Sequence, residues 1–126
     1  MRILIVEDEM IIAMDIQSRL VTFGHHVVDI INNGEKVLKN LNMMNPDLIL
    51  MDIRIKGNMD GIELTKKIHA SKDIPVIFMT AFNDIDTAER IDATNYHGFI
   101  TKPINIYKLN DMIENINNNI CKQVRN

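Results

Sequence analysis

The sequence predicts an α/β fold, a doubly wound sheet of five parallel strands with helices on both faces. Short apolar runs alternate with segments of helical periodicity along the whole chain, and only short turns connect them. Such alternation is typical of βα units, whose helices pack against both faces of a parallel sheet. With 126 residues, the chain has the size of a single domain.

The first two strand–helix units are marked by their turn residues. Gly24 ends a helix that starts at Met10, and Pro46 ends the second helix, since glycine and proline are favoured at or just beyond helix ends. Apolar runs at 2–6 and 27–31 precede these helices. Both runs are rich in aliphatic and β-branched residues, which is typical of buried strands.

The other three strands are apolar runs that each lead into a polar residue. They are 48–51 before Asp52, 76–79 before Thr80, and 99–100 before Thr101-Lys102-Pro103. Asp60, with Glu63 three residues later, predicts the start of a helix. The last helix carries an apolar stripe over 106–120, which needs a partner surface: the sheet, or else a dimer or linker seam.

Composition excludes several classes of protein. A net charge of −3 gives no basic surface for nucleic acid. The single Cys121 cannot form an internal disulfide, and no run of about twenty apolar residues predicts a membrane span. We therefore expect a cytoplasmic domain over 1–118, with 119–126 as a tail or the start of a linker.

Polar side chains follow four of the five strands. They are Glu7 and Asp8 after the first strand, Asp52 after the third, Thr80 after the fourth and Lys102 after the fifth. The carboxyl ends of parallel strands meet at one edge of the sheet, where open α/β sheets bind ligands. Asp52 alone could be a capping residue in a turn, but the five together predict a site.

Three converging carboxylates repel one another, by on the order of 4 kcal/mol for each pair at 4 Å and an effective dielectric of 20. One lysine cannot balance this charge, so a hard, oxygen-preferring cation such as Mg²⁺ is expected. With the cation bound, Asp52 could act as a nucleophile toward phosphorus and form an aspartyl phosphate. Lys102 and Thr80 would then neutralise and orient the phosphoryl oxygens.

Four strings, in order across nearly the whole chain, resemble the receiver domains of two-component response regulators. They are RILIVEDE, LILMDIRIKGNMDGIEL, PVIFMTA and GFITKP. The resemblance implies a flavodoxin-like (βα)5 fold with strand order 2-1-3-4-5. It also implies that a phosphohistidine of a histidine kinase or phosphotransfer protein is the phosphoryl donor to Asp52.

Further roles follow from the same resemblance. Mg²⁺ would be held by Asp8, Asp52 and the backbone carbonyl of Arg54, with Glu7 in the acidic pocket through water. Thr80 and Lys102 would contact the phosphoryl group, and Pro103 would follow a cis peptide bond.

The resemblance also implies how the signal leaves the site. Thr80 would move toward the phosphoryl group and Phe99 would swing inward, changing the surface of helix four, strand five and helix five. The changed surface would bind a downstream protein or output domain, and a homodimer through helices four and five is expected. Arg54 and Phe82 are poor water-orienting residues beside the path of hydrolytic water, which predicts slow self-dephosphorylation.

Three other interpretations compete with this one. A flavodoxin-type cofactor module shares the architecture, but the acidic triplet 7–9 would repel a flavin phosphate. A small aspartyl-nucleophile phosphatase shares the chemistry, yet such enzymes carry their nucleophile after the first strand, with a second Asp two residues later. In this chain Asp52 follows the third strand, and the residue two positions later is Arg54. A docking module without phosphorylation is disfavoured because all five polar residues are present.

Overall fold

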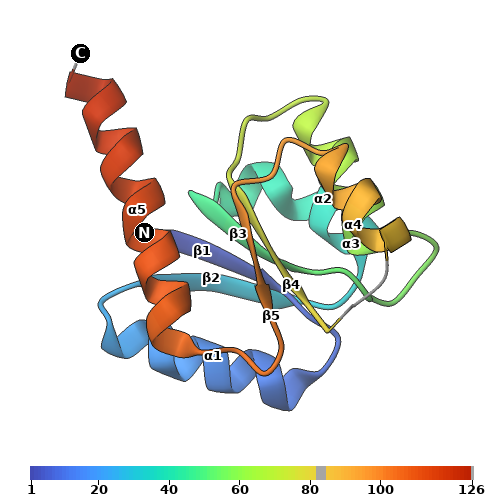
Figure 1. Cartoon of the computed structure of the whole chain (residues 1–126), viewed down its shortest axis with the longest axis horizontal. Helices are drawn as coiled ribbons and strands as arrows, with labels where there is room; N and C mark the ends of the chain where they lie inside the picture. The colour runs from blue at the N-terminus through green and yellow to red at the C-terminus, as the bar shows by residue number, and fades with distance from the viewer. Residues whose placement is uncertain (82–84, 126) are drawn as a thin grey trace.

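The computed structural model describes residues 1–81 and 85–125, which form five consecutive strand–helix units (Figure 1). The strands are β1 (Arg2–Val6), β2 (His26–Ile31), β3 (Leu48–Asp52), β4 (Val76–Thr80) and β5 (Gly98–Thr101). The helices are α1 (Met10–Thr22), α2 (Gly34–Met44), α3 (Gly61–His69), α4 (Ile85–Asp92) and α5 (Ile106–Arg125). The alternation predicted from the sequence is confirmed.

The five strands form one parallel sheet in the order β2-β1-β3-β4-β5. This is the doubly wound, flavodoxin-like order that the resemblance implied. The chain reverses its direction of winding between β1 and β3, because β2 lies on one side of β1 and all later strands lie on the other. In open α/β sheets a ligand site lies at the carboxyl ends of the strands at such a switch point.

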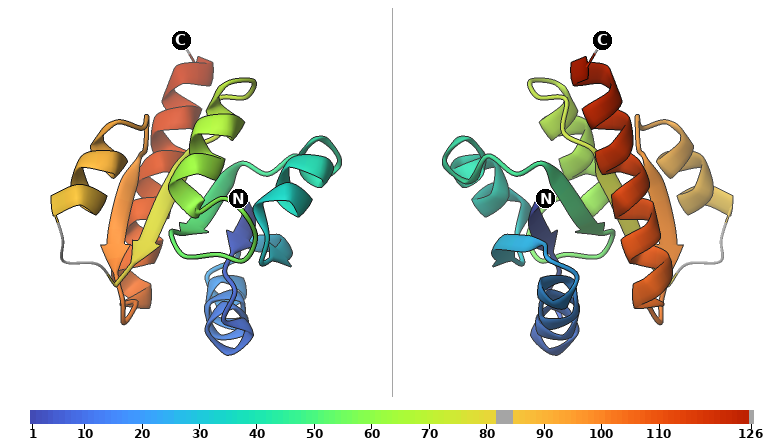
Figure 2. Two further views of the ribbon diagram at one scale, coloured as in Figure 1. Left: turned by 90° about the vertical axis from the view of Figure 1, so that its right-hand side faces the viewer. Right: turned by 90° about the vertical axis from the view of Figure 1, so that its left-hand side faces the viewer.

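Helices cover both faces of the sheet, as Figure 2 shows. One core contains buried side chains of α1 and α5, including Leu20 and Leu109, packed against one face. The other core contains buried side chains of α2, α3 and α4, including Leu41 and Leu64, packed against the opposite face. The central strands β3 and β4 are fully buried along their length, so their last residues are held firmly at the sheet edge.

The start of α3 is fixed by local hydrogen bonding and by close packing. Asp60 is its N-cap residue, and its Oδ1 accepts a hydrogen bond of 2.9 Å from the backbone N–H of Glu63, as the sequence predicted. At Gly61 the backbone packs so tightly on β3 that a Cβ would collide with the carbonyl oxygen of Asp52. The end of β3 and the start of α3 therefore hold each other in place.

The last helix, α5, continues without a break across the predicted boundary between 118 and 119. Its apolar stripe packs on the sheet, because Ile106, Leu109, Ile113 and Ile116 are buried in the core shared with α1. This favours the sheet as the partner of the stripe over a dimer or linker seam. Figure 1 shows the C-terminal part of the helix projecting beyond the sheet. Within the described residues, no helix has the length and hydropathy that a membrane span requires.

Candidate functional site

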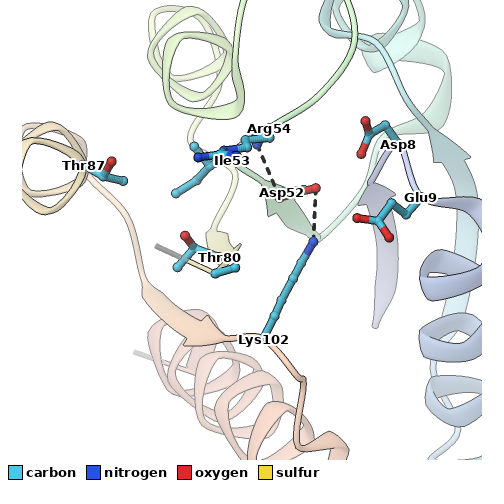
Figure 3. Close-up of a pocket in the computed structure, with 9 residues that line it drawn as sticks. Asp8, Glu9, Asp52, Ile53, Arg54, Thr80, Thr87 and Lys102 are labelled. Atoms are coloured by element: carbon cyan, nitrogen blue, oxygen red, sulfur yellow. Dashed lines mark hydrogen bonds and ion pairs between the residues drawn. The ribbon is translucent and has the colours of Figure 1, made fainter. Parts of the chain in front are cut away.

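Asp52 is the last residue of β3 and lies at the carboxyl edge of the sheet. Its side chain is only 7% exposed, because the strand before it is buried on both faces. Two donors contact the carboxylate: Lys102 Nζ lies 3.3 Å from Oδ2, and the backbone N–H of Arg54 donates a long hydrogen bond of 3.4 Å to Oδ1. Figure 3 shows both contacts, with Lys102 reaching across from the end of β5.

Glu7, Asp8 and Asp52 form an acidic cluster at this edge. One carboxylate oxygen of each lies within 4.8 Å of the others, so the convergence expected at the ends of β1 and β3 is present. Two oxygens bound to the same Mg²⁺ at about 2.1 Å lie at most about 4.2 Å apart. The three side chains therefore fit a magnesium ion after a small movement, or with water between the ion and one carboxylate.

Lys102 is the cation that faces this cluster. Its Nζ donates a hydrogen bond of 3.0 Å to Glu7 Oε2 as well as the contact to Asp52. Burial alone would lower the pKa of Lys102, but the hydrogen bonds and charges of Glu7 and Asp52 outweigh burial, and its pKa is raised above the ordinary value. Lys102 is therefore a fixed positive charge at the site.

Glu7 is fully buried, and its environment disfavours the ionised form. Burial is the largest cause, followed by the hydrogen bond and the charge of Asp52, and together they raise the pKa of Glu7 to about 7. The hydrogen bonds from Lys102 and from the backbone N–H of Glu9 act in the opposite direction without cancelling them. One ammonium thus fails to compensate the buried carboxylates, and an additional cation would favour the ionised form of Glu7.

A polar cavity of about 370 Å³ opens in front of Asp52. Thr80, buried at the end of β4, lies on its floor beside Asp52 (Figure 3). Asp8, Arg54 and Lys102 also line the cavity. Its volume accommodates a phosphoryl group with several waters, and carboxylate, hydroxyl and ammonium groups line its walls.

The remaining predicted residues lie around this cavity rather than in its centre. The side chain of Arg54 is exposed. The peptide bond between Lys102 and Pro103 is cis, the isomer that the resemblance implied. Phe99 lies on β5 with 46% of its surface exposed and does not line the cavity. Phe82 lies outside the described residues.

Thr87 lines the cavity from α4 and was not predicted from the sequence. Figure 3 shows it on the helix, across the cavity from Asp8 and Glu9. Residues at strand ends can be found from the sequence because an apolar run stops there. Thr87 is within a helix, and only the packing of α4 against the rest of the protein brings it to the site.

Comparisons with known proteins agree with this geometry. The family model for the response regulator receiver domain matches residues 3–114. The chain is 31% identical over 113 residues to the transcriptional regulatory protein PdtaR of Mycobacterium tuberculosis, covering 90% of this chain and 55% of that protein. It is 35% identical over 112 residues to the luminescence regulatory protein LuxO of Vibrio campbellii, covering 87% of this chain and 24% of that protein.

A solved structure leads to the same family. The N-terminal domain of a response regulator/sensory box/GGDEF 3-domain protein from Carboxydothermus hydrogenoformans superposes with a TM-score of 0.86 at 30% identity, covering 98% of this chain and 99% of that one. The chain spans about half or less of the length of the two curated relatives described above. The similarity therefore concerns the receiver domain and not the activities of the full-length relatives. The chain belongs to the response regulator receiver domain family of two-component signalling, and its Glu7, Asp8 and Asp52 cluster is consistent with a phosphorylation site.

Proposed function

We propose that this protein is a phosphorylation-controlled switch in which Asp52 accepts a phosphoryl group from a phosphohistidine of a histidine kinase or phosphotransfer protein. The observation that carries the proposal is the setting of Asp52. A nearly buried carboxylate faces a cavity of about 370 Å³ together with an ammonium 3.3 Å away and two further carboxylates. An aspartate that only capped a turn would need neither the cavity nor the neighbouring ammonium and carboxylates.

In the transfer step, a carboxylate oxygen of Asp52 attacks phosphorus and forms an O–P bond. The N–P bond to the donor imidazole breaks, and its electron pair remains on the imidazole nitrogen. Lys102 neutralises charge on the phosphoryl oxygens, and the hydroxyl of Thr80 donates a hydrogen bond to one of them. Asp8, Asp52 and the backbone carbonyl of Arg54, with Glu7 through water, would hold Mg²⁺, which would supply additional positive charge.

The first test uses acetyl phosphate with Mg²⁺ and intact mass spectrometry. We expect an adduct of one phosphoryl group that is lost in Asp52→Asn and retained in Asp29→Asn, a matched change at an exposed aspartate of β2. Lack of an adduct in the wild type would favour a docking module without phosphorylation. Steady turnover of a phosphoester would instead indicate a small phosphatase.

The donor protein must reach the mouth of the cavity, and an apolar surface lies beside it. Ile11 of α1 is 86% exposed and Met14 is 56% exposed. Ile11 also lines a second cavity of about 400 Å³ together with Pro103 and Ile104, and Lys102 lines both cavities. Because this surface is continuous with the phosphorylation site, we propose that a helix of the phosphohistidine donor docks here.

A matched pair of variants separates docking from chemistry. Ile11→Lys should lower the rate of phosphoryl transfer from phosphorylated histidine kinases in a kinase panel and leave labelling by acetyl phosphate unchanged. Met43→Lys on α2, at a residue with the same 86% exposure, should change neither rate. Equal transfer rates for Ile11→Lys and the wild type would show that the donor docks elsewhere.

The outgoing signal is proposed to pass through α4, β5 and α5. In this proposal Thr80 moves toward the phosphoryl group and Phe99 leaves its exposed position. The altered surface would bind a downstream protein or output domain, or a second copy of the chain. Sedimentation with and without beryllofluoride, a phosphoryl mimic, tests for the dimer.

We also propose slow self-dephosphorylation. Arg54 can pair with phosphoryl oxygens from the rim of the cavity, and neither Arg54 nor Phe82 activates water. The half-life of the phosphorylated wild type is compared with that of Phe82→Ala and Arg54→Ala. A short half-life in the wild type that neither substitution changes would contradict this part of the proposal.

A further inference from the structure

Among the described residues, three aromatic side chains meet where β4, β5 and the segment between α4 and β5 come together. The ring centroids of Phe78 and Tyr96 are 6.1 Å apart, and those of Tyr96 and Phe99 are 6.4 Å apart. Tilted aromatic pairs at such separations attract each other. Tyr96 therefore bridges a residue of the buried core and a residue at the surface.

The register of the sheet explains why these rings meet. Phe78 of β4 and Phe99 of β5 are direct partners in the parallel ladder, so their side chains start from the same face of the sheet. Phe78 is fully buried, whereas Phe99 is 46% exposed. Tyr96 precedes β5, packs against the core that contains Phe78 and contacts Phe99 as well.

Tyr96 is itself anchored at both ends. Its ring is partly buried against the core, and its hydroxyl lies 3.5 Å from Asp92 Oδ1 at the end of α4. Phe99, in contrast, lies on the edge strand β5 and has 46% of its surface exposed. The ring of Tyr96, held in place in this way, stabilises the position of Phe99 in which the two rings are in contact.

We propose that Tyr96 is a positioning residue that stabilises the outward position of Phe99 and thereby sets how readily the protein switches. This inference rests on the proposed function, in which phosphorylation of Asp52 is coupled to inward movement of Phe99. Any contact present only with Phe99 outward opposes phosphorylation by linkage, because a ligand shifts the equilibrium only by its differential affinity for the two states. Loss of the Tyr96 contact should make switching easier.

The test is the affinity for beryllofluoride in the presence of Mg²⁺. It is measured by fluorine NMR titration of protein that carries fluorinated phenylalanine. The Phe99 resonance is assigned by its absence in Phe99→Leu. Tyr96→Leu removes the ring that pairs with Phe99 and should tighten beryllofluoride binding about 2- to 12-fold. Tyr96→Phe keeps the ring contacts and loses only the hydroxyl contact with Asp92, so its affinity should lie closer to that of the wild type than to that of Tyr96→Leu.

Two controls identify the contact responsible. Tyr107→Leu removes the other tyrosine, which pairs edge-on with Phe23 at 6.0 Å, and should leave the affinity unchanged. In a Phe99→Leu background, Tyr96→Leu should also have no effect, because the partner ring is already gone. An unchanged or weaker affinity in Tyr96→Leu, or the same tightening in the Phe99→Leu background, would overturn the proposal.

A measurement on the wild type does not depend on the folding of any variant. Nuclear Overhauser contacts between the rings of Tyr96 and Phe99 should be present in the free protein and lost when beryllofluoride binds. Contacts that persist unchanged would overturn the role of Tyr96. If the wild type fails to bind beryllofluoride, or binds it equally well as Asp52→Asn, the proposed function itself is wrong.

Discussion

Replacing Glu7 by glutamine should change how the stability of the protein depends on pH. Burial, and then the hydrogen bond and charge of Asp52, raise the pKa of Glu7 from 4.5 to about 7 in the folded protein. The folded state therefore holds this proton more tightly than the unfolded chain does. The resulting stabilisation is fully present below a pH of about 4.5 and is lost as the pH rises through about 7.

The size of the effect follows from the shift in pKa. The difference between 4.5 and about 7 corresponds to about 3 to 4 kcal/mol of unfolding free energy, since each pKa unit is worth about 1.4 kcal/mol, and about 2 to 3 kcal/mol of it is lost between about pH 5 and pH 8. Glutamine has the shape of the protonated glutamate and does not titrate. The variant should thus lack the loss of stability that the wild type shows between about pH 5 and pH 8.

Urea unfolding without divalent cations measures this difference. The unfolding free energy of Glu7→Gln, relative to the wild type, should increase by about 2 to 3 kcal/mol between about pH 5 and pH 8. Glu9→Gln removes the same charge from the exposed neighbouring residue and should follow the wild type. Parallel pH profiles for the wild type and Glu7→Gln would refute the reasoning.

Adding Mg²⁺ extends the same experiment. A cation competes with the proton for the carboxylate cluster, so the wild type should regain stability at about pH 8 and much less at about pH 5. At a Mg²⁺ concentration ten times its dissociation constant, binding adds about 1.4 kcal/mol. A stabilisation by Mg²⁺ that is independent of pH would show that Glu7 is uncoupled from the metal site.

Two further predictions concern the elements around the site. Arg90 of α4 forms an ion pair with Asp60 at 2.7 Å, and 42% and 27% of the two side chains are exposed. A double-mutant cycle of Arg90→Gln and Asp60→Asn should therefore give a coupling free energy of about 0.5 kcal/mol that decreases as salt is added. Arg19→Gln, which removes an exposed ion pair within α1, is the control, and additive effects of Arg90→Gln and Asp60→Asn would show that their ion pair contributes nothing to stability. Gly61→Ala should lower the unfolding free energy by about 2 to 3 kcal/mol in urea unfolding, because its Cβ would collide with the carbonyl oxygen of Asp52; a stability equal to that of the wild type would show that α3 can move away freely.

The strand ends could be predicted from the sequence because each is a local signal. An apolar run that stops at a polar residue identifies the carboxyl end of a strand, as at Asp52 and Thr80. Parallel strands then bring these ends to one edge of the sheet whatever the details of packing. The fold and the acidic cluster therefore followed from patterns in the chain, and the resemblance provided the strand order.

Contacts between distant residues could not be predicted in this way. The adjacent pair His25 and His26 gives only a weak suggestion of a metal site in the sequence. In the structure, His25 is buried and its Nε2 lies 2.8 Å from Asn110 Oδ1 on α5. Likewise, the spacing of Tyr96 from Phe99 shows that they are near in sequence but not that their rings touch. Such contacts depend on how helices dock, which periodicity does not specify.

The magnitudes separate what drives the proposed switch from what tunes it. Moving a population from 1:99 to 99:1 requires about 5.5 kcal/mol of differential stabilisation. An aromatic contact such as that of Tyr96 with Phe99 contributes about 0.5 to 1.5 kcal/mol, which changes the set point but cannot supply the transition. Two like charges at 4 Å cost on the order of 4 kcal/mol at an effective dielectric of 20, and the acidic cluster brings three carboxylates within 4.8 Å of one another. Electrostatic terms at the acidic cluster thus have the size that the proposed transition requires, whereas in the proposal the contact of Tyr96 with Phe99 only adjusts its set point.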